Sequence, residues 1–162
     1  MKKSIFIIGL IFIGTFAMSS QTIADKTIGL RFGDANGLGA EVSFQKSLGD
    51  SNRLEAGLSW RNGSYYNAIK LAAIYQWVFD IENIEGLNWY VGAGGGFGSW
   101  KVKSDFTGNG GTYLFAAGDI GIDYKFSFPL LLSLDFRPEI GFADFNNDLG
   151  LDFALGVRYT FD

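Results

Sequence analysis

The chain has 162 residues, of which 48% are hydrophobic, 17% aromatic and only 19% charged, with 23 glycines and two prolines. This composition leaves room for one domain plus a targeting segment and is typical of a β-rich protein rather than a disordered or collagen-like one. The absence of cysteine and histidine excludes disulfides, thiolate metal sites and the commonest general base, and a net charge of −4 argues against nucleic-acid binding.

Residues 1–20 are predicted to be a cleaved secretory signal peptide. Lys2 and Lys3 form a basic start, residues 5–16 are apolar, and Ala17-Met18-Ser19 has the small-x-small pattern of a cleavage site. The apolar run is too short for a transmembrane helix, and no later stretch has eighteen consecutive apolar residues. The mature domain is therefore expected to be residues 21–162, exported from the cytoplasm.

Eight later segments alternate between apolar and polar residues, as strands with one apolar face do. They cover residues 27–33, 38–46, 53–61, 66–79, 89–98, 112–124, 130–140 and 149–161. The last has an apolar residue at every odd position from Leu149 to Phe161. A closed transmembrane barrel needs about 9–11 residues per strand, which this segment exceeds. Pro138 is expected near the end of the seventh strand, since proline cannot donate to a ladder.

The size of the side chains favours lipid outside the barrel. Bulky aromatic residues occupy the apolar face and need the room of a convex surface, whereas glycine, alanine, serine and charged residues occupy the other face. The aromatic residues expected to face lipid or to form interfacial girdles are Trp60, Trp77, Trp89, Phe136, Phe153, Tyr159 and Phe161. The sequence predicts an all-β fold, an eight-stranded antiparallel up-and-down transmembrane β-barrel. The alternative is a soluble periplasmic ligand-binding barrel with the two faces reversed.

The signal peptide, the eight alternating segments and the final GVRYTF together resemble the small eight-stranded outer-membrane barrels, the OmpA transmembrane domain and OmpX group. The pattern is particularly similar to outer-membrane β-barrel proteins of Bacteroidetes-type bacteria. The resemblance implies a monomer in the bacterial outer membrane, in contact with membrane lipid and lipopolysaccharide. It also implies recognition by the outer-membrane assembly machinery through the C-terminal strand, although Asp162 follows the aromatic Phe161 here.

The polar face of the predicted strands carries a nearly balanced set of charges that would point into the lumen. These are Arg31, Arg53, Arg61, Lys70, Arg137 and Arg158 with Glu41, Glu55, Asp119, Asp123, Asp135, Glu139 and Asp152. In so narrow a barrel, buried charges must be paired, because an unpaired one costs several kcal/mol of desolvation. We expect a network of ion pairs that fills the lumen; the alternative is a narrow path for ions or small polar solutes.

Other chemistry has weaker support. The glycines of residues 92–98 match neither phosphate-binding motif and are expected to make space for long charged side chains from the facing wall. The loop 144–148 has oxygen-bearing residues at alternate positions, but Leu149 stands where a calcium loop has glycine and no distal glutamate follows. No catalytic, metal or cofactor site is predicted. The expected role is a structural or surface barrel rather than an enzyme.

Overall fold

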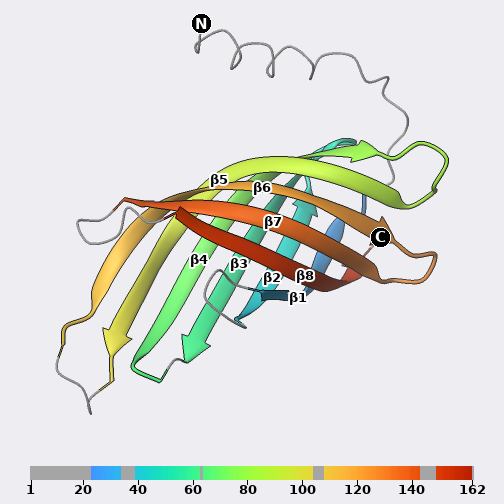
Figure 1. The fold of residues 1–162 in the computed structure, drawn as a ribbon. Helices are drawn as coiled ribbons and strands as arrows, with labels where there is room; N and C mark the ends of the chain where they lie inside the picture. Colours follow the sequence, from blue (N-terminus) through green and yellow to red (C-terminus); the bar gives the residue numbers. More distant parts are fainter. Residues whose placement is uncertain (1–22, 34–38, 63, 104–107, 143–148, 162) are drawn as a thin grey trace, which may run out of the picture.

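The computed structural model describes residues 23–33, 39–62, 64–103, 108–142 and 149–161. These residues form eight strands: β1 (Lys26–Gly33), β2 (Ala40–Ser47), β3 (Asn52–Asn62), β4 (Tyr66–Asp80), β5 (Leu87–Val102), β6 (Gly111–Lys125), β7 (Leu131–Phe142) and β8 (Leu149–Phe161). Each pairs antiparallel with the next, and β8 pairs with β1 to close a barrel (Figure 1). The predicted eight-stranded up-and-down barrel is confirmed. In the described part of the chain, no helix is long and apolar enough to cross a membrane.

The two ends of the barrel are built differently. Because the strand number is even, β1 starts and β8 finishes at the same end, which we call the terminal end. The connections at this end are residues 48–51, 81–86 and 126–130. The other end, the loop end, lies at the lower left of Figure 1, where β3, β4, β5 and β6 extend beyond the remaining strands.

The strands are strongly staggered around the barrel. From Arg31, the paired residues through β2 and β3 lead to Lys70 on β4. In the opposite direction, through β8, β7, β6 and β5, they lead to Asp80 on the same strand, ten positions away. This offset is the shear that fixes the strand tilt and diameter of a closed barrel. It also decides which inward-facing side chains meet across the lumen.

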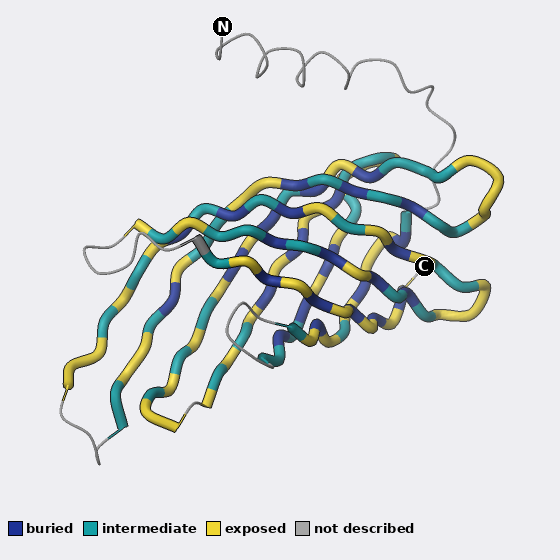
Figure 2. Tube along the Cα trace, viewed as in Figure 1, coloured by how far each residue is buried: buried dark blue, intermediate teal, exposed yellow. Residues whose placement is uncertain are grey.

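The alternation of burial along each strand shows which face is inside (Figure 2). On β8, every even residue from Asp152 to Thr160 is buried and every odd residue from Leu151 to Phe161 is exposed. The exposed residues are apolar and the buried ones are small, polar or charged. The reversed arrangement of the soluble-barrel alternative is therefore wrong, because the exposed face, not the interior, carries the bulky apolar side chains.

Two strands extend two or more residues further towards the loop end than the sequence predicts. β5 runs through Val102, four residues beyond the predicted end, because it pairs with the full length of β4 up to Tyr66. β7 continues to Phe142, two residues beyond the predicted end, so Pro138, which was expected near the end of the strand, lies four residues inside it. The β6–β7 ladder has a gap between the Ala117–Glu139 and Ile120–Phe136 pairs, while Pro138 stays paired with Leu151 on β8. The strand tolerates the missing N–H because its other neighbour holds it in place.

Candidate functional site

The interior of the barrel is the candidate site, and it is charged. The structure places twelve of the predicted lumenal residues on the inner face: Arg31, Glu41, Arg53, Glu55, Lys70, Asp119, Asp123, Asp135, Arg137, Glu139, Asp152 and Arg158. Ten of them are buried; Lys70 and Glu139, towards the loop end, keep side chains 17% exposed. Arg61 lies on the same face, half-buried, and donates to the hydroxyl of Tyr66 at 3.2 Å.

Glu55 on β3 is the centre of the network. Arg137 Nη2 on β7 lies 2.9 Å from Glu55 Oε1, and Arg158 Nη2 on β8 lies 3.4 Å from both carboxylate oxygens. Two amides complete its shell: Gln45 Nε2 donates at 2.6 Å and Gln76 Nε2 at 3.2 Å. Because β3 is not a neighbour of β7 or β8 in the sheet, these contacts cross the lumen. A carboxylate with four donors is fully desolvated yet well satisfied.

The two central arginines have further partners. Arg137 also contacts Glu41 at 3.4 Å and Asp119 at 3.6 Å. Arg158 donates from Nε to Ser43 Oγ at 3.0 Å and from Nη1 to Ser133 Oγ at 2.6 Å. Each guanidinium therefore links several strands, for which its five N–H donors in a rigid planar fork are better suited than the three of a lysine ammonium.

Arg31 forms a second cluster against β7 and β8. Its Nε donates to both carboxylate oxygens of Asp135, at 2.9 and 3.2 Å, and its Nη2 also contacts Asp135. Its Nη1 lies 2.7 Å from Asp152 Oδ2. A bidentate pair of this kind is stronger and more directional than a single contact. It joins the first strand to the last two from inside the barrel.

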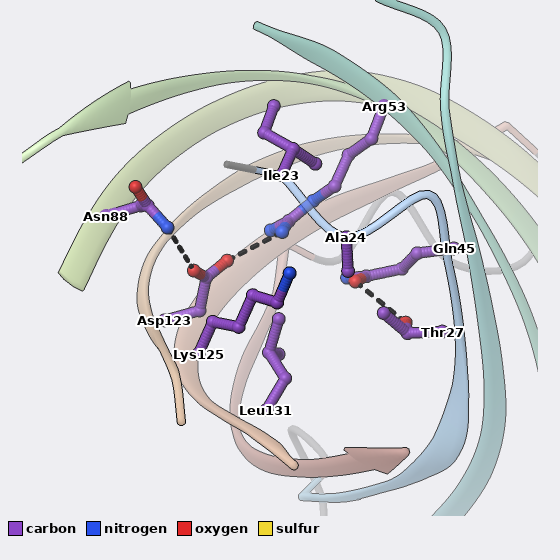
Figure 3. Close-up of a pocket in the computed structure, with 9 residues that line it drawn as sticks. All are labelled: Ile23, Ala24, Thr27, Gln45, Arg53, Asn88, Asp123, Lys125 and Leu131. Atoms are coloured by element: carbon purple, nitrogen blue, oxygen red, sulfur yellow. Dashed lines mark hydrogen bonds and ion pairs between the residues drawn. The ribbon is translucent and has the colours of Figure 1, made fainter. Parts of the chain in front are cut away.

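A third cluster lies towards the terminal end (Figure 3). Arg53 Nη1 lies 2.6 Å from Asp123 Oδ2, Asn88 Nδ2 donates to Asp123 Oδ1 at 3.1 Å, and the Arg53 guanidinium stacks 4.5 Å above the ring of Tyr90. Ala24, which precedes β1, is buried and lines the same small cavity as Arg53 and Asp123, beside Gln45 (Figure 3). The cavity left between them has a volume of about 10 Å³, room for about one water molecule.

Towards the loop end, the interior changes from polar to apolar. Ala72 and Ile74 of β4 pack with Phe115 and Ala117 of β6, and Tyr113 lies against them. Lys70 Nζ, 5.5 Å from the centre of the Phe115 ring, forms an ion pair with Glu139 at 2.7 Å. The lumen thus holds an apolar layer on its β4–β6 side in addition to its charges.

The glycines of β5 serve this apolar layer rather than the charged residues. A Cβ at Gly96 would meet the Phe115 ring and the backbone oxygen of Leu71, and one at Gly98 would meet the Tyr113 ring. The expectation that these glycines make room for long charged side chains is wrong. That space is provided elsewhere: the Glu41 carboxylate lies against Gly57, and the Arg158 guanidinium against Gly156.

Sequence reasoning missed the neutral polar residues of the network. The buried interior has four arginines and six carboxylates, so the guanidinium groups alone leave some carboxylate oxygens without a donor. Gln45, Gln76 and Asn88 donate to Glu55, Asp119 and Asp123 and supply the missing hydrogen bonds. The signal was present, because all three residues lie on the inward face by the alternation rule.

The predicted lipid-facing aromatic residues all lie on the outer surface. Trp60, Trp77, Phe153, Tyr159 and Phe161 are exposed, whereas Trp89 and Phe136 are half-buried against neighbouring rings. Their ring centres lie 4.5 Å from those of Phe79 and Phe153, respectively. Trp77, Trp89, Tyr159 and Phe161 are close to the terminal end of their strands, as an interfacial girdle would be.

Some predictions fall outside the described residues. These are the signal peptide at residues 1–20, the loop 144–148 and Asp162. Among the residues that are described, no three carboxylates are grouped so as to hold a metal ion.

Comparison with known proteins adds evidence for the fold. No protein-family model and no curated protein sequence matches the chain. Solved structures do match. Neisserial surface protein A has a TM-score of 0.64 and 14% sequence identity, and the match covers 84% of this chain and 96% of that one. The N-terminal β-barrel domain of Pseudomonas aeruginosa OprF has a TM-score of 0.63 and 19% identity, covering 85% of this chain and 98% of that one, and the attachment invasion locus protein Ail of Yersinia pestis has a TM-score of 0.57 and 14% identity, covering 84% and 96%, respectively. The chain has the fold of these small eight-stranded outer-membrane barrels.

Proposed function

We propose that this protein is a monomeric, non-catalytic barrel of the bacterial outer membrane whose lumen is closed by its own ion pairs. The observation that carries the proposal is the contact of Glu55 with Arg137 and Arg158, three side chains that are each at most 1% exposed. These side chains meet from opposite walls, where a channel would need water. The mature protein would be residues 21–162, released from a signal peptide.

The outer surface supports a membrane location. From Ile28 and Leu30 on β1 to Val157 and Tyr159 on β8, large apolar side chains are exposed around the barrel. Such a continuous apolar surface is costly in water and favourable in lipid. The partners we propose are membrane lipid and lipopolysaccharide, together with the assembly machinery that would recognise the strand ending at Phe161. By analogy with bacterial barrels, the terminal end would face the periplasm.

If ion pairs close the lumen, the paired side chains must leave no continuous path of water through the barrel. The cavity of about 10 Å³ that Ala24 lines is too small for a hydrated ion. The buried groups are held by several partners each, and breaking one such pair costs about 3–5 kcal/mol. The ion pairs that close the lumen would therefore be a stable part of the fold.

A narrow channel is the second candidate, because some buried polar atoms have no hydrogen-bond partner among the described residues. Arg137 Nε, Asp119 Oδ1 and Asp152 Oδ1 are such atoms, and water molecules could satisfy them. The apolar layer around Phe115 argues against an open path, since apolar constrictions exclude water.

Conductance of the refolded protein in a planar bilayer tests the proposal. Folding is first verified by the resistance of the unboiled protein to detergent. We expect a silent membrane from the wild type and small steps from Arg137→Ala, which removes a guanidinium that fills the lumen. Steps from the wild type would favour the channel. Silence from a folded Arg137→Ala variant would show that something other than the ion pairs closes the barrel.

A further inference from the structure

The outer face of the strands carries charged residues that take no part in the ion pairs of the lumen. Across the described strands, the outward-facing residues include three charged ones, Lys26, Lys46 and Lys101, and no carboxylate. Lys101 lies towards the loop end, and the other two lie towards the terminal end. Within the strands, the charges that border the apolar surface are therefore all positive, whereas exposed carboxylates at the terminal end, such as Asp25 and Asp50, lie outside the strands.

Lys26 and Lys46 are direct cross-strand partners on β1 and β2. The next pair along, Asp25 and Ser47, is joined by a backbone hydrogen bond of 2.8 Å, so Lys26 and Lys46 form a non-hydrogen-bonded pair. Side chains of such a pair are at their closest, with Cβ atoms about 4.5–5.5 Å apart. Two like charges placed there destabilise the sheet unless an anion lies between them.

Intramolecular compensation is incomplete. The Asp25 carboxylate lies 3.5 Å from Lys26 Nζ, but both side chains are at least half exposed, at 61% and 50%. Among the described residues, no carboxylate lies within ion-pair distance of Lys46. The pair thus keeps a net positive charge that faces outward.

The surroundings of the two lysines fit one class of anion. On the adjacent outward positions towards the loop end lie Ile28 and Phe44, which are exposed, apolar and paired with each other. On the β8 side, Phe161 pairs with Lys26, and its ring contacts that of Tyr159 at 4.9 Å between centres. Positive charge at the edge of an exposed apolar and aromatic surface matches a phosphate headgroup with its acyl chains alongside.

We propose that Lys26 and Lys46 together bind the phosphate of an anionic phospholipid in the leaflet at the terminal end. This inference rests on the proposed membrane location and adds a lipid preference to it. The lysines hold the headgroup, and Ile28, Phe44 and Phe161 contact the chains. A lysine near an anionic membrane surface contributes about a fivefold preference, so two lysines make a measurable difference between charged and neutral lipid.

The test is solution NMR of the folded barrel in phosphatidylcholine nanodiscs, titrated with phosphatidylglycerol as the probe. We expect the amide signals of Thr27, Gln45 and Phe161 to shift in the wild type. Lys26→Gln with Lys46→Gln should weaken the apparent preference by about fivefold for each lysine removed. Lys26→Arg with Lys46→Arg should keep it, and Lys101→Gln is the matched control that should leave these signals unchanged.

The outcomes separate the two proposals. A wild type that fails to insert into bilayers contradicts the membrane location itself. A wild type that inserts but responds equally to both lipids overturns the phospholipid site alone, and so does a double glutamine variant with an unchanged preference. If the double variant does not fold, the single variants and the comparison of lipids with the wild type still decide the question.

Discussion

Arg158 on the last strand and Glu55 on the third face each other across the lumen, with Arg158 Nη2 3.4 Å from both oxygens of the carboxylate. The two residues are 103 positions apart in the chain. Neither has access to water, since their side chains are 0% and 1% exposed. Their contact ties the final strand to the opposite wall and makes the stability of the barrel depend on it.

Arg158→Leu should therefore destabilise the folded barrel by about 3–5 kcal/mol, because it leaves Glu55, Ser43 and Ser133 short of a buried donor. The measurement is the urea midpoint of the barrel in detergent, followed by its electrophoretic mobility without boiling. Thr160→Val is the control: Thr160 is the next inward residue of β8, and its buried hydroxyl has no hydrogen-bond partner among the described residues. An Arg158→Leu variant as stable as Thr160→Val would contradict the role given to this arginine.

The ion pairs should differ in strength with depth. Arg31→Met removes the buried partner of Asp135 and Asp152 and should cost about 3–5 kcal/mol. Lys70→Met breaks a pair whose side chains are 17% exposed and should cost less than the loss of Arg31, because water reaches the remaining Glu139. Equilibrium unfolding of the two variants under the same conditions gives the comparison. Equal losses of unfolding free energy would mean that the Lys70–Glu139 pair is as inaccessible to water as the Arg31 cluster.

Phe153→Arg tests the outer face. Phe153 is 65% exposed and lies well inside β8, so a charge there should cost about 2–4 kcal/mol on insertion into a bilayer. The fraction of protein folded into vesicles is the measurement. Leu48→Arg, in the turn after β2, is the matched control, because Leu48 is equally apolar but lies at the terminal end. Efficient insertion of Phe153→Arg would place this position outside the lipid.

Alanine substitutions at different inward glycines should lower the stability of the barrel by different amounts. An alanine at Gly96 meets the backbone oxygen of Leu71 and the Phe115 ring, so it forces the strands or the apolar layer apart. At Gly57 the nearest atoms belong to the end of the Glu41 side chain, which can move. We expect Gly96→Ala to lower the unfolding midpoint clearly and Gly57→Ala to lower it less. The reverse order would show that Glu41 is more rigidly held than the β5 backbone.

Much of this interior could be predicted from alternation alone. Arg31, Glu55 and Arg158 fall on the polar positions of their segments, and a period of two leaves no choice of face. The partners could not be predicted, because they depend on the ten-residue stagger, which arises only when β8 pairs with β1. The apolar layer was also missed, because Ala72 and Ile74 interrupt the polar face of β4 and resemble residues of the other side.

The continuation of β7 through Pro138 shows a similar limit. A proline is a sound local signal for the end of a strand, but here the ladder with β8 supplies the hydrogen bonds that the β6 side lacks. Only the closed sheet provides neighbours on both sides of every strand. Local rules therefore place strands more reliably than they place strand ends.

The stagger has a consequence for how the chain reaches its final form. Glu55 on β3 precedes Arg137 and Arg158 in the chain, so its contacts with these two arginines form only once the final two strands are in place. If β8 slipped by two residues against β1, Arg31 would face Ala154 or Arg158 instead of Gly156, and the guanidinium groups of the first and last strands would be offset from their carboxylates. The interior thus opposes incorrect closure: only the correct pairing of β8 with β1 brings these arginines to their carboxylates, and a shifted pairing leaves buried charges without their partners.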